Sequence, residues 1–143
     1  MMRNIFESVL ILVILALVQG CAGTNPVQAT IPTGPLVLEP ASATYAPQKL
    51  FASSPNQLFV LTNPSTSGGS AIITSVVTES DQFQIEPADS TCPTVGTLPS
   101  GLSCKIAVKF VPTNAGKQTA TLKVTGSAAN SPQTASLAGA GLK

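Results

Sequence analysis

The clearest pattern of apolar and polar residues along this chain repeats every two positions. It lies in the segment 104–110, where one set of positions is Cys104, Ile106, Val108 and Phe110 and the other is Lys105, Ala107 and Lys109. Successive side chains of a strand point to opposite faces, so a period of two predicts a half-buried antiparallel strand. We therefore expect the first set to point into a core and the second to face solvent.

Similar short apolar runs follow one another from Leu36 onward. They are rich in β-branched residues and end at turn-forming residues such as Pro40, Asn63–Pro64 and Pro112. No segment has the length and the 3.6-residue period of a core helix. Seven or eight short strands at intervals of roughly 8–12 residues are typical of a β-sandwich. The expected strands are 36–39, 48–52, 57–62, 71–79, 83–86, 104–110, 119–125 and 134–137, with Gly139–Gly141 closing the domain.

The N-terminus predicts an export signal. A basic start with Arg3 is followed by ten apolar residues, Val9 to Val18. A membrane-spanning helix needs roughly 20 apolar residues, whereas the core of a signal peptide needs roughly 7–15. Residues 1–20 are therefore interpreted as a signal peptide that is removed.

The next residues, Val18-Gln19-Gly20-Cys21, resemble the lipobox of bacterial lipoproteins. The resemblance implies that Cys21 is acylated and becomes the first residue of the mature protein. Ordinary cleavage nearby, which would leave a free thiol, is the alternative. Two or more acyl chains give stable anchoring, so the lipoprotein would be held at the cell envelope, on the outer membrane or a membrane facing the periplasm.

The segment 21–35 is rich in Thr, Pro, Gly, Ala and Asn and has no apolar periodicity, which predicts a flexible tether. The folded domain is expected over 36–141. Its two cysteines, Cys92 and Cys104, lie 12 positions apart. In an exported chain a disulfide is the default for such a pair, and it would contribute roughly 3 kcal/mol. A redox pair usually has the spacing Cys-x-x-Cys, and a zinc site needs more ligands.

Several motifs in the second half of the chain carry a family resemblance. They are the segment 101–113 with its Val108-Lys109-Phe110-Val111-Pro112 run, Gly116, Ala120-Thr121-Leu122 and the closing 137–141. Together they resemble the bacterial choice-of-anchor D domain, which is similar to the ASPM–SPD-2–Hydin (ASH) domain. The resemblance implies an immunoglobulin-like antiparallel sandwich, a Cys92–Cys104 pair, and a spacer or interaction module without catalytic residues. In the first half, Asn63-Pro64-Ser65 departs from the family's Asn-Thr-Gly-like turn.

The amino-acid composition argues against several classes of function. The net charge is +1 and only 9% of residues are charged, so no broad field is available for nucleic acid. There is no His, which is both the common general base and the commonest metal ligand. Neither a G-x-S-x-G nor a G-x-x-x-x-G-K-[ST] motif occurs. We expect no catalytic residue, no metal and no cofactor.

Three sets of side chains raise the question of a further site. Ca²⁺ needs several oxygens at once, but the spacing of the acidic set fits no known loop, which favours solvated turn residues for Glu79, Asp81, Glu86 and Asp89. The lysine set is expected to share one outer sheet face and keep it hydrated: Lys105, Lys109 and Lys123. Core filling is expected, rather than a ligand slot, for Phe59, Phe83 and Phe110.

Two functions of different classes remain open. The first is a non-catalytic envelope lipoprotein that offers loops or an edge strand to a protein partner. The second is an envelope-anchored ligand-binding protein or small enzyme, which needs a convergent polar pocket around Asp81, Glu86 and Asp89. A stand-alone copy of a domain from long adhesive arrays is a third possibility, although the chain has no internal repeat.

Overall fold

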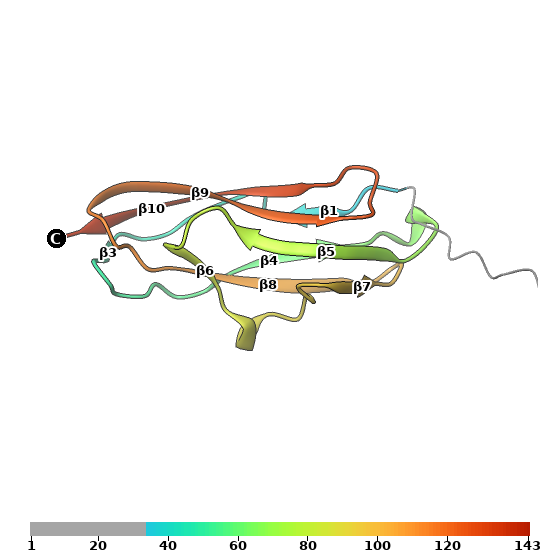
Figure 1. Ribbon diagram of the computed structural model, residues 1–143, viewed down its shortest axis with the longest axis horizontal. Coiled ribbons are helices and arrows are strands. Elements are labelled where there is room, and N and C mark those ends of the chain that lie inside the picture. Colours follow the sequence, from blue (N-terminus) through green and yellow to red (C-terminus); the bar gives the residue numbers. More distant parts are fainter. Residues whose placement is uncertain (1–33) are drawn as a thin grey trace, which may run out of the picture.

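A computed structural model describes residues 34–143, which form two β-sheets packed face to face (Figure 1). The first, sheet A, is antiparallel throughout and has the order β1-β4-β8-β6. Its strands are β1 (Val37–Glu39), β4 (Gln57–Thr62), β8 (Ser103–Phe110) and β6 (Phe83–Ile85). Two short 3₁₀ turns, η1 (Ser65–Ser67) and η2 (Pro87–Asp89), lie between strands.

Sheet B has six strands in the order β2-β10-β9-β5-β7, with β3 also pairing with β10. Its strands are β2 (Ser42–Thr44), β3 (Gln48–Lys49), β5 (Ala71–Thr78), β7 (Gly96–Leu98), β9 (Gly116–Gly126) and β10 (Gln133–Leu142). The all-β, immunoglobulin-like sandwich is confirmed. The described residues contain ten strands, however, because β2 and β7, which are three residues long, are too short to show a period in the sequence.

The pairing is also not wholly antiparallel, since β2 and β3 run parallel to β10. The expected strand 48–52 shortens to β3, because the chain turns at Leu50–Phe51. Along residues 34–143 there is no helix with the length and hydropathy to cross a membrane. The predicted signal peptide, the acylated Cys21 and most of the tether lie outside the described residues.

The predicted alternation of buried and exposed residues over 104–110 is confirmed in β8 for its buried set. Cys104 is 6% exposed, and Ile106, Val108 and Phe110 are fully buried. Ala107, expected on the solvent face, is buried as well. The segment that follows β6 covers it, and the Ser90 hydroxyl accepts a hydrogen bond from the Ala107 N–H at 2.9 Å.

The aromatic side chains fill the core, as expected for the three phenylalanines. Phe83 and Phe110 stack with their ring centroids 4.7 Å apart, and Tyr45 meets Phe83 edge-on at 5.5 Å. Phe59 is fully buried on β4. The Tyr45 hydroxyl donates to the Val108 carbonyl at 3.0 Å, and burial raises the pKa of Tyr45 above its ordinary value.

The last strand is longer than the sequence predicts. β10 continues through the glycine-rich stretch that was expected to close the domain after residue 137. A Cβ on Gly139 would lie 2.6 Å from the ring of Phe110, so glycine is required where sheet B passes over that ring. The small residues of 138–141 are therefore a packing requirement of a strand and not a turn.

Candidate functional site

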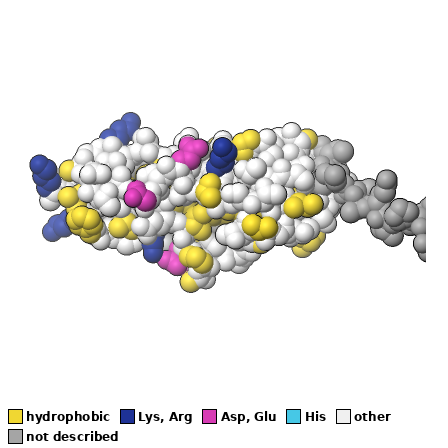
Figure 2. Space-filling model, viewed as in Figure 1, with side chains coloured by type: hydrophobic (Ala, Val, Ile, Leu, Met, Phe, Trp, Pro, Cys, Tyr) yellow, Lys and Arg dark blue, Asp and Glu magenta, His cyan; other side chains and the backbone are white. Residues whose placement is uncertain are grey.

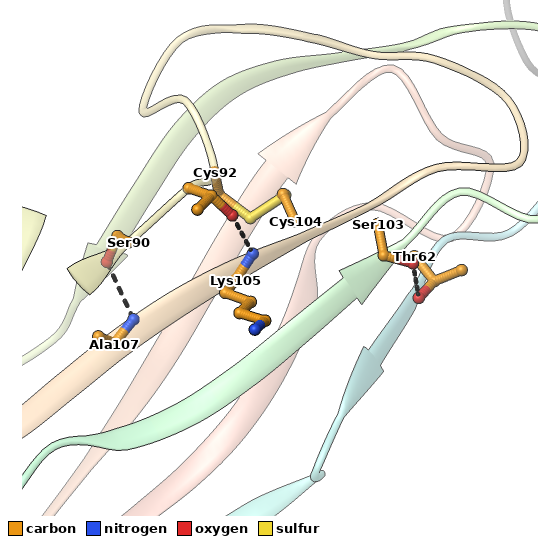
Figure 3. Close-up of a disulfide and its surroundings, with 8 residues drawn as sticks. Thr62, Ser90, Cys92, Ser103, Cys104, Lys105 and Ala107 are labelled. Atoms are coloured by element: carbon orange, nitrogen blue, oxygen red, sulfur yellow. Dashed lines mark hydrogen bonds between the residues drawn. A yellow bond between two sulfur atoms is a disulfide. The ribbon is translucent and has the colours of Figure 1, made fainter.

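The predicted disulfide is present and joins Cys92 to Cys104 on β8 (Figure 3). Cys92 ends a segment, residues 86–92, that runs along the outer edge of β8 beyond the point where β6 stops. The N–H groups of Thr91 and Cys92 both donate to the carbonyl of Lys105, at 2.8 and 3.0 Å. The Glu86 N–H donates to the carbonyl of Ala107 at 2.9 Å.

Two hydroxyls complete this edge in place of a strand. The Lys105 N–H donates to Thr91 Oγ1 at 2.8 Å, and the Ala107 N–H donates to Ser90 Oγ at 2.9 Å. Backbone groups near a core need partners, and serine and threonine hydroxyls can supply them. The 86–92 segment therefore closes the edge of sheet A without being a strand.

The same segment carries the closest ion pair. Lys109 Nζ lies 2.6 Å from Glu86 Oε2. The hydrogen bond from Lys109, together with its positive charge, lowers the pKa of the Glu86 carboxyl below its ordinary value. Both side chains remain about one quarter exposed, so the pair orients the start of the segment and adds little stability.

In sheet B, by contrast, one strand edge is left half uncovered. β9 pairs with β5 from Ile73 to Thr78, whereas β7 pairs with its other side only from Ala71 to Ile73. No strand of the described chain therefore pairs with residues 74–78 on that side, although the Thr78 hydroxyl donates to the carbonyls of Ser80 and Phe83. The Glu79 N–H donates to the Thr121 carbonyl of β9 at 3.0 Å. This bond establishes which residues of β5 point their backbone N–H and C=O groups toward β9, because the direction alternates from one residue to the next.

That alternation determines which backbone groups of β5 face the open side. Glu79 bonds toward β9, so Val77 and Ser75 also direct their N–H and C=O groups to β9. Val76 and Thr78 direct theirs the opposite way. Among residues 34–143 no backbone hydrogen bond reaches these groups of Val76 and Thr78. The open edge of β5 is thus an unpaired backbone edge.

A hollow of about 190 Å³ lies beside this edge, between the two sheets. Its apolar walls are Val76, Ile85, Pro87, Cys92 and Ile106, and two hydroxyl residues, Ser90 and Thr94, complete its lining. The disulfide segment thus forms one wall of the hollow while it closes the edge of β8. The arrangement suits an apolar side chain and offers no charged group for catalysis.

A second hollow is a wide depression of about 500 Å³ along β9 and β10. Glu79 and Lys117 lie among its lining residues with the hydroxyls of Thr119, Thr121 and Ser136. It is open to solvent, and within the described chain these two charged groups form no ion pair. It lacks the enclosed, convergent geometry of a small-molecule site.

The acidic residues do not come together. Glu86 pairs with Lys109, Asp89 accepts a hydrogen bond from Asn56, and Glu79 lies at the other hollow. No group of three potential metal ligands forms within residues 34–143. Figure 2 shows the acidic side chains in view spread singly over the surface. Neither of the two hollows described above is lined by Asp81, Glu86 or Asp89, the residues on which the enzyme hypothesis depends.

The expected lysine face is wrong. Lys105 and Lys109 belong to β8 in sheet A, whereas Lys123 belongs to β9 in sheet B. The two outer faces point in opposite directions, so the three charges cannot act on one surface. Period-two patterns assign each strand a face but do not say which sheet the strand joins.

One buried polar residue escaped the sequence analysis. Asn63 is fully buried, and its amide donates to the carbonyls of Gly69 and Leu98 at 3.0 and 2.9 Å. Its backbone bonds Leu102 and Gly101, so it joins the loop after β4 to the loop before β8. The position just before a proline gave only a turn signal, and no local pattern showed the burial.

The comparisons with known proteins find similarity in the fold only, among solved structures. No protein-family model matches the sequence. No curated protein matches it either. Among solved structures, the ASH/PapD-like domain 7 of human CEP192 matches with a TM-score of 0.59 at 13% identity, over 80% of this chain and 89% of that chain.

Two bacterial enzymes contain a similar domain. A family 123 glycoside hydrolase from Clostridium perfringens matches with a TM-score of 0.55 at 10% identity, over 72% of this chain. The secreted serine protease VesC of Vibrio cholerae matches with a TM-score of 0.53 at 16% identity, over 76% of this chain. The matched part is 23% of each enzyme, so their activities do not transfer. The described residues therefore have an immunoglobulin-like fold similar to that of an ASH/PapD-like domain, as the sequence resemblance implied.

Proposed function

We propose that this chain is an exported bacterial lipoprotein whose ASH-like sandwich is a non-catalytic protein-interaction module. The observation that carries the proposal is the unpaired edge of β5 beside an apolar hollow, since an open backbone edge and an apolar hollow together can receive another chain. The lack of His and the dispersal of the acidic residues support the non-catalytic part.

The proposed localisation depends on Cys21, which would hold the domain at the cell envelope through its acyl chains. The chain enters the sandwich at one end and β10 leaves at the other, so a tether would present the whole length of the domain (Figure 1). The partner is a protein of the same compartment, and no nucleic acid is involved.

Cell fractionation tests the anchor. We expect Cys21→Ala to move the protein out of the membrane fraction, while Thr24→Ala, three positions further along the tether, leaves it there. Metabolic labelling with palmitate should mark the wild type and not Cys21→Ala. A Cys21→Ala protein that stays in the membrane fraction through an uncleaved N-terminus would refute the lipoprotein assignment.

Photo-cross-linking in cells tests the interaction. Cross-linking residues placed at exposed positions of both sheets, Leu58 on β4 and Val77 on β5, sample the two faces. We expect one defined adduct that requires the folded domain and is lost in the core variant Phe110→Ala. Failure of every exposed position to give an adduct in the native envelope would contradict a protein-interaction role.

A further inference from the structure

The open edge of β5 and the hollow next to it form one continuous surface with a definite ligand chemistry. We propose that this surface binds an extended segment of a partner polypeptide, which adds as a strand to β5 and places one aliphatic side chain in the hollow. This inference rests on the proposed interaction role and names its site and the chemistry of the partner.

The backbone part of the recognition comes from the ladder of β5. Val76 directs its N–H and C=O toward the open side, where no described residue bonds them. A strand laid along residues 74–78 would exchange a pair of backbone hydrogen bonds with Val76. Main-chain hydrogen bonds of this kind provide affinity in strand addition, and pockets for alternate side chains provide specificity.

The side-chain part follows from the same register. A partner residue directly opposite Val76 points to the same face of the sheet as the Val76 side chain. Val76 faces inward and lines the hollow, so the opposing partner side chain would enter the hollow too. At about 190 Å³ the hollow is smaller than the roughly 300–1,000 Å³ of small-molecule sites. Its apolar walls fit one aliphatic side chain.

The open stretch carries neither the charges nor the prolines that usually protect an edge. Natural edge strands carry charges, prolines or bulges that discourage pairing. Residues 74–78 contain no charge and no proline, four of the five are β-branched, and Val77 is 45% exposed. The bulge of β5, between Ile73 and Ser75, lies at the start of this stretch, and the pairing with β9 is regular from Ser75 to Thr78. The sequence thus keeps the stretch suited to pairing.

A single strand fits this edge better than a second copy of the domain. The hollow is bordered by residues 87–94 of the same chain, next to the edge. In a two-fold pairing of β5 with β5, both copies of that segment would meet at the same edge. An extended segment with no second layer avoids the collision.

A set of short peptides supplies the probe. Each has the sequence Lys-Thr-Thr-X-Thr-Thr-Lys, with X as Ala, Val, Ile, Leu, Met or Phe, and is titrated against the full chain by NMR. We expect the aliphatic members to bind about tenfold more tightly than the Ala member, because they fill the hollow. The Val76 amide should shift and become protected from hydrogen exchange.

Backbone methylation of the peptide tests the pairing without changing the protein. The N–H of residue X faces Val76, so N-methylation there should weaken binding about tenfold or more. The N–H of the next residue points away from β5, and its methylation should change affinity less than about twofold. Equal effects of the two methyl groups would overturn the strand-addition geometry.

A matched pair of protein variants tests the hollow. Thr94 lines the hollow and is exposed, so Thr94→Trp should obstruct it and weaken peptide binding about tenfold. Val95 is its neighbour, is 72% exposed and does not line the hollow, so Val95→Trp serves as the control. Both variants should keep the wild-type circular dichroism spectrum and melting temperature.

The outcomes separate this inference from the function on which it rests. If no peptide binds up to about 1 mM, or if Thr94→Trp and Val95→Trp behave alike, the β5 site is refuted. A symmetric dimer that protects Val76 without peptide would also refute it, by assigning the edge to a second copy. In each case an intact cross-link at Leu58 would keep the interaction module, with another surface as its contact.

Discussion

Removing the disulfide gives the most quantitative test of how this domain is stabilised. Cys92 and Cys104 close a loop with a sequence separation of 12. In the chain-entropy model, losing such a cross-link costs about 3 kcal/mol of unfolding free energy. For a domain of about 100 residues, 1 kcal/mol shifts the melting temperature by roughly 4 °C. We therefore expect the Cys92→Ala, Cys104→Ala double variant to melt about 12 °C below the wild type.

Calorimetry of three samples separates the cross-link from side-chain packing. Cys104 is buried, so the double variant also loses a packed sulfur atom. The wild type treated with a reductant keeps both sulfur atoms and loses only the bond, and it should account for most of the shift. A melting temperature that changes by less than about 2 °C on reduction, together with two titratable thiols in the untreated protein, would refute the stabilising Cys92–Cys104 disulfide.

Breaking the disulfide should first weaken the hydrogen bonds of the 86–92 segment to β8, before the whole domain unfolds. The Lys105 and Ala107 amides bond to the hydroxyls of the disulfide segment. The Ile106 amide, between them in sequence, belongs to the pairing with Phe59 on β4. After reduction we expect faster hydrogen exchange at Lys105 and Ala107 and an unchanged rate at Ile106. Equal acceleration at all three would show that the whole sheet opens.

Three further experiments probe features outside the disulfide. Tyr45 is the sole tyrosine of the chain, and its pKa is raised in the folded protein. The stability that its neutral hydroxyl provides is therefore complete below about pH 10 and falls as the pH rises above it. In an alkaline titration, the absorbance at 295 nm, which reports tyrosine ionisation, and the circular dichroism, which reports unfolding, should change together. Phe51 has a φ of 66° and is 74% exposed, so Phe51→Gly should raise the melting temperature by about 4 °C, whereas Phe51→Ala should not. Asn63→Ala leaves two buried carbonyls without their donor and should cost about 2–4 kcal/mol in denaturant unfolding, so a cost under about 1 kcal/mol would contradict its bridging role.

Local alternation was sufficient to predict the strands that cross the middle of the sandwich. Apart from the buried Ala107, the residues of β8 alternate between core and exposed or half-buried positions, and the apolar residues of the sequence alternate in the same way. The same holds for β9, whose buried Leu122 and Val124 alternate with exposed or half-buried residues. Such strands need no knowledge of their neighbours to be found.

The features that escaped prediction depend on neighbours distant in sequence. The first half of β10 was predicted as a strand, but its second half reads as the end of the domain unless the ring of Phe110 is known to lie against Gly139. β7 is three residues long and is defined only by its pairing with the start of β5. The open edge of β5 has no sequence signature, because a covered and an uncovered strand of this kind have the same composition.

The origin of that open edge lies in a competition between two edges for one segment. After β6 the chain must pass from sheet A to sheet B, and on the way it meets the uncovered part of β8 and the uncovered part of β5. Cys92, joined to Cys104, fixes the segment against β8, so pairing with β5 begins only at Gly96. A β7 long enough to cover β5 up to Thr78 would require Thr91 and Cys92 to leave β8, and the Lys105 amide would then lose its partner. The disulfide that holds this segment on β8 therefore also explains why half of the β5 edge has no pairing partner among the described residues.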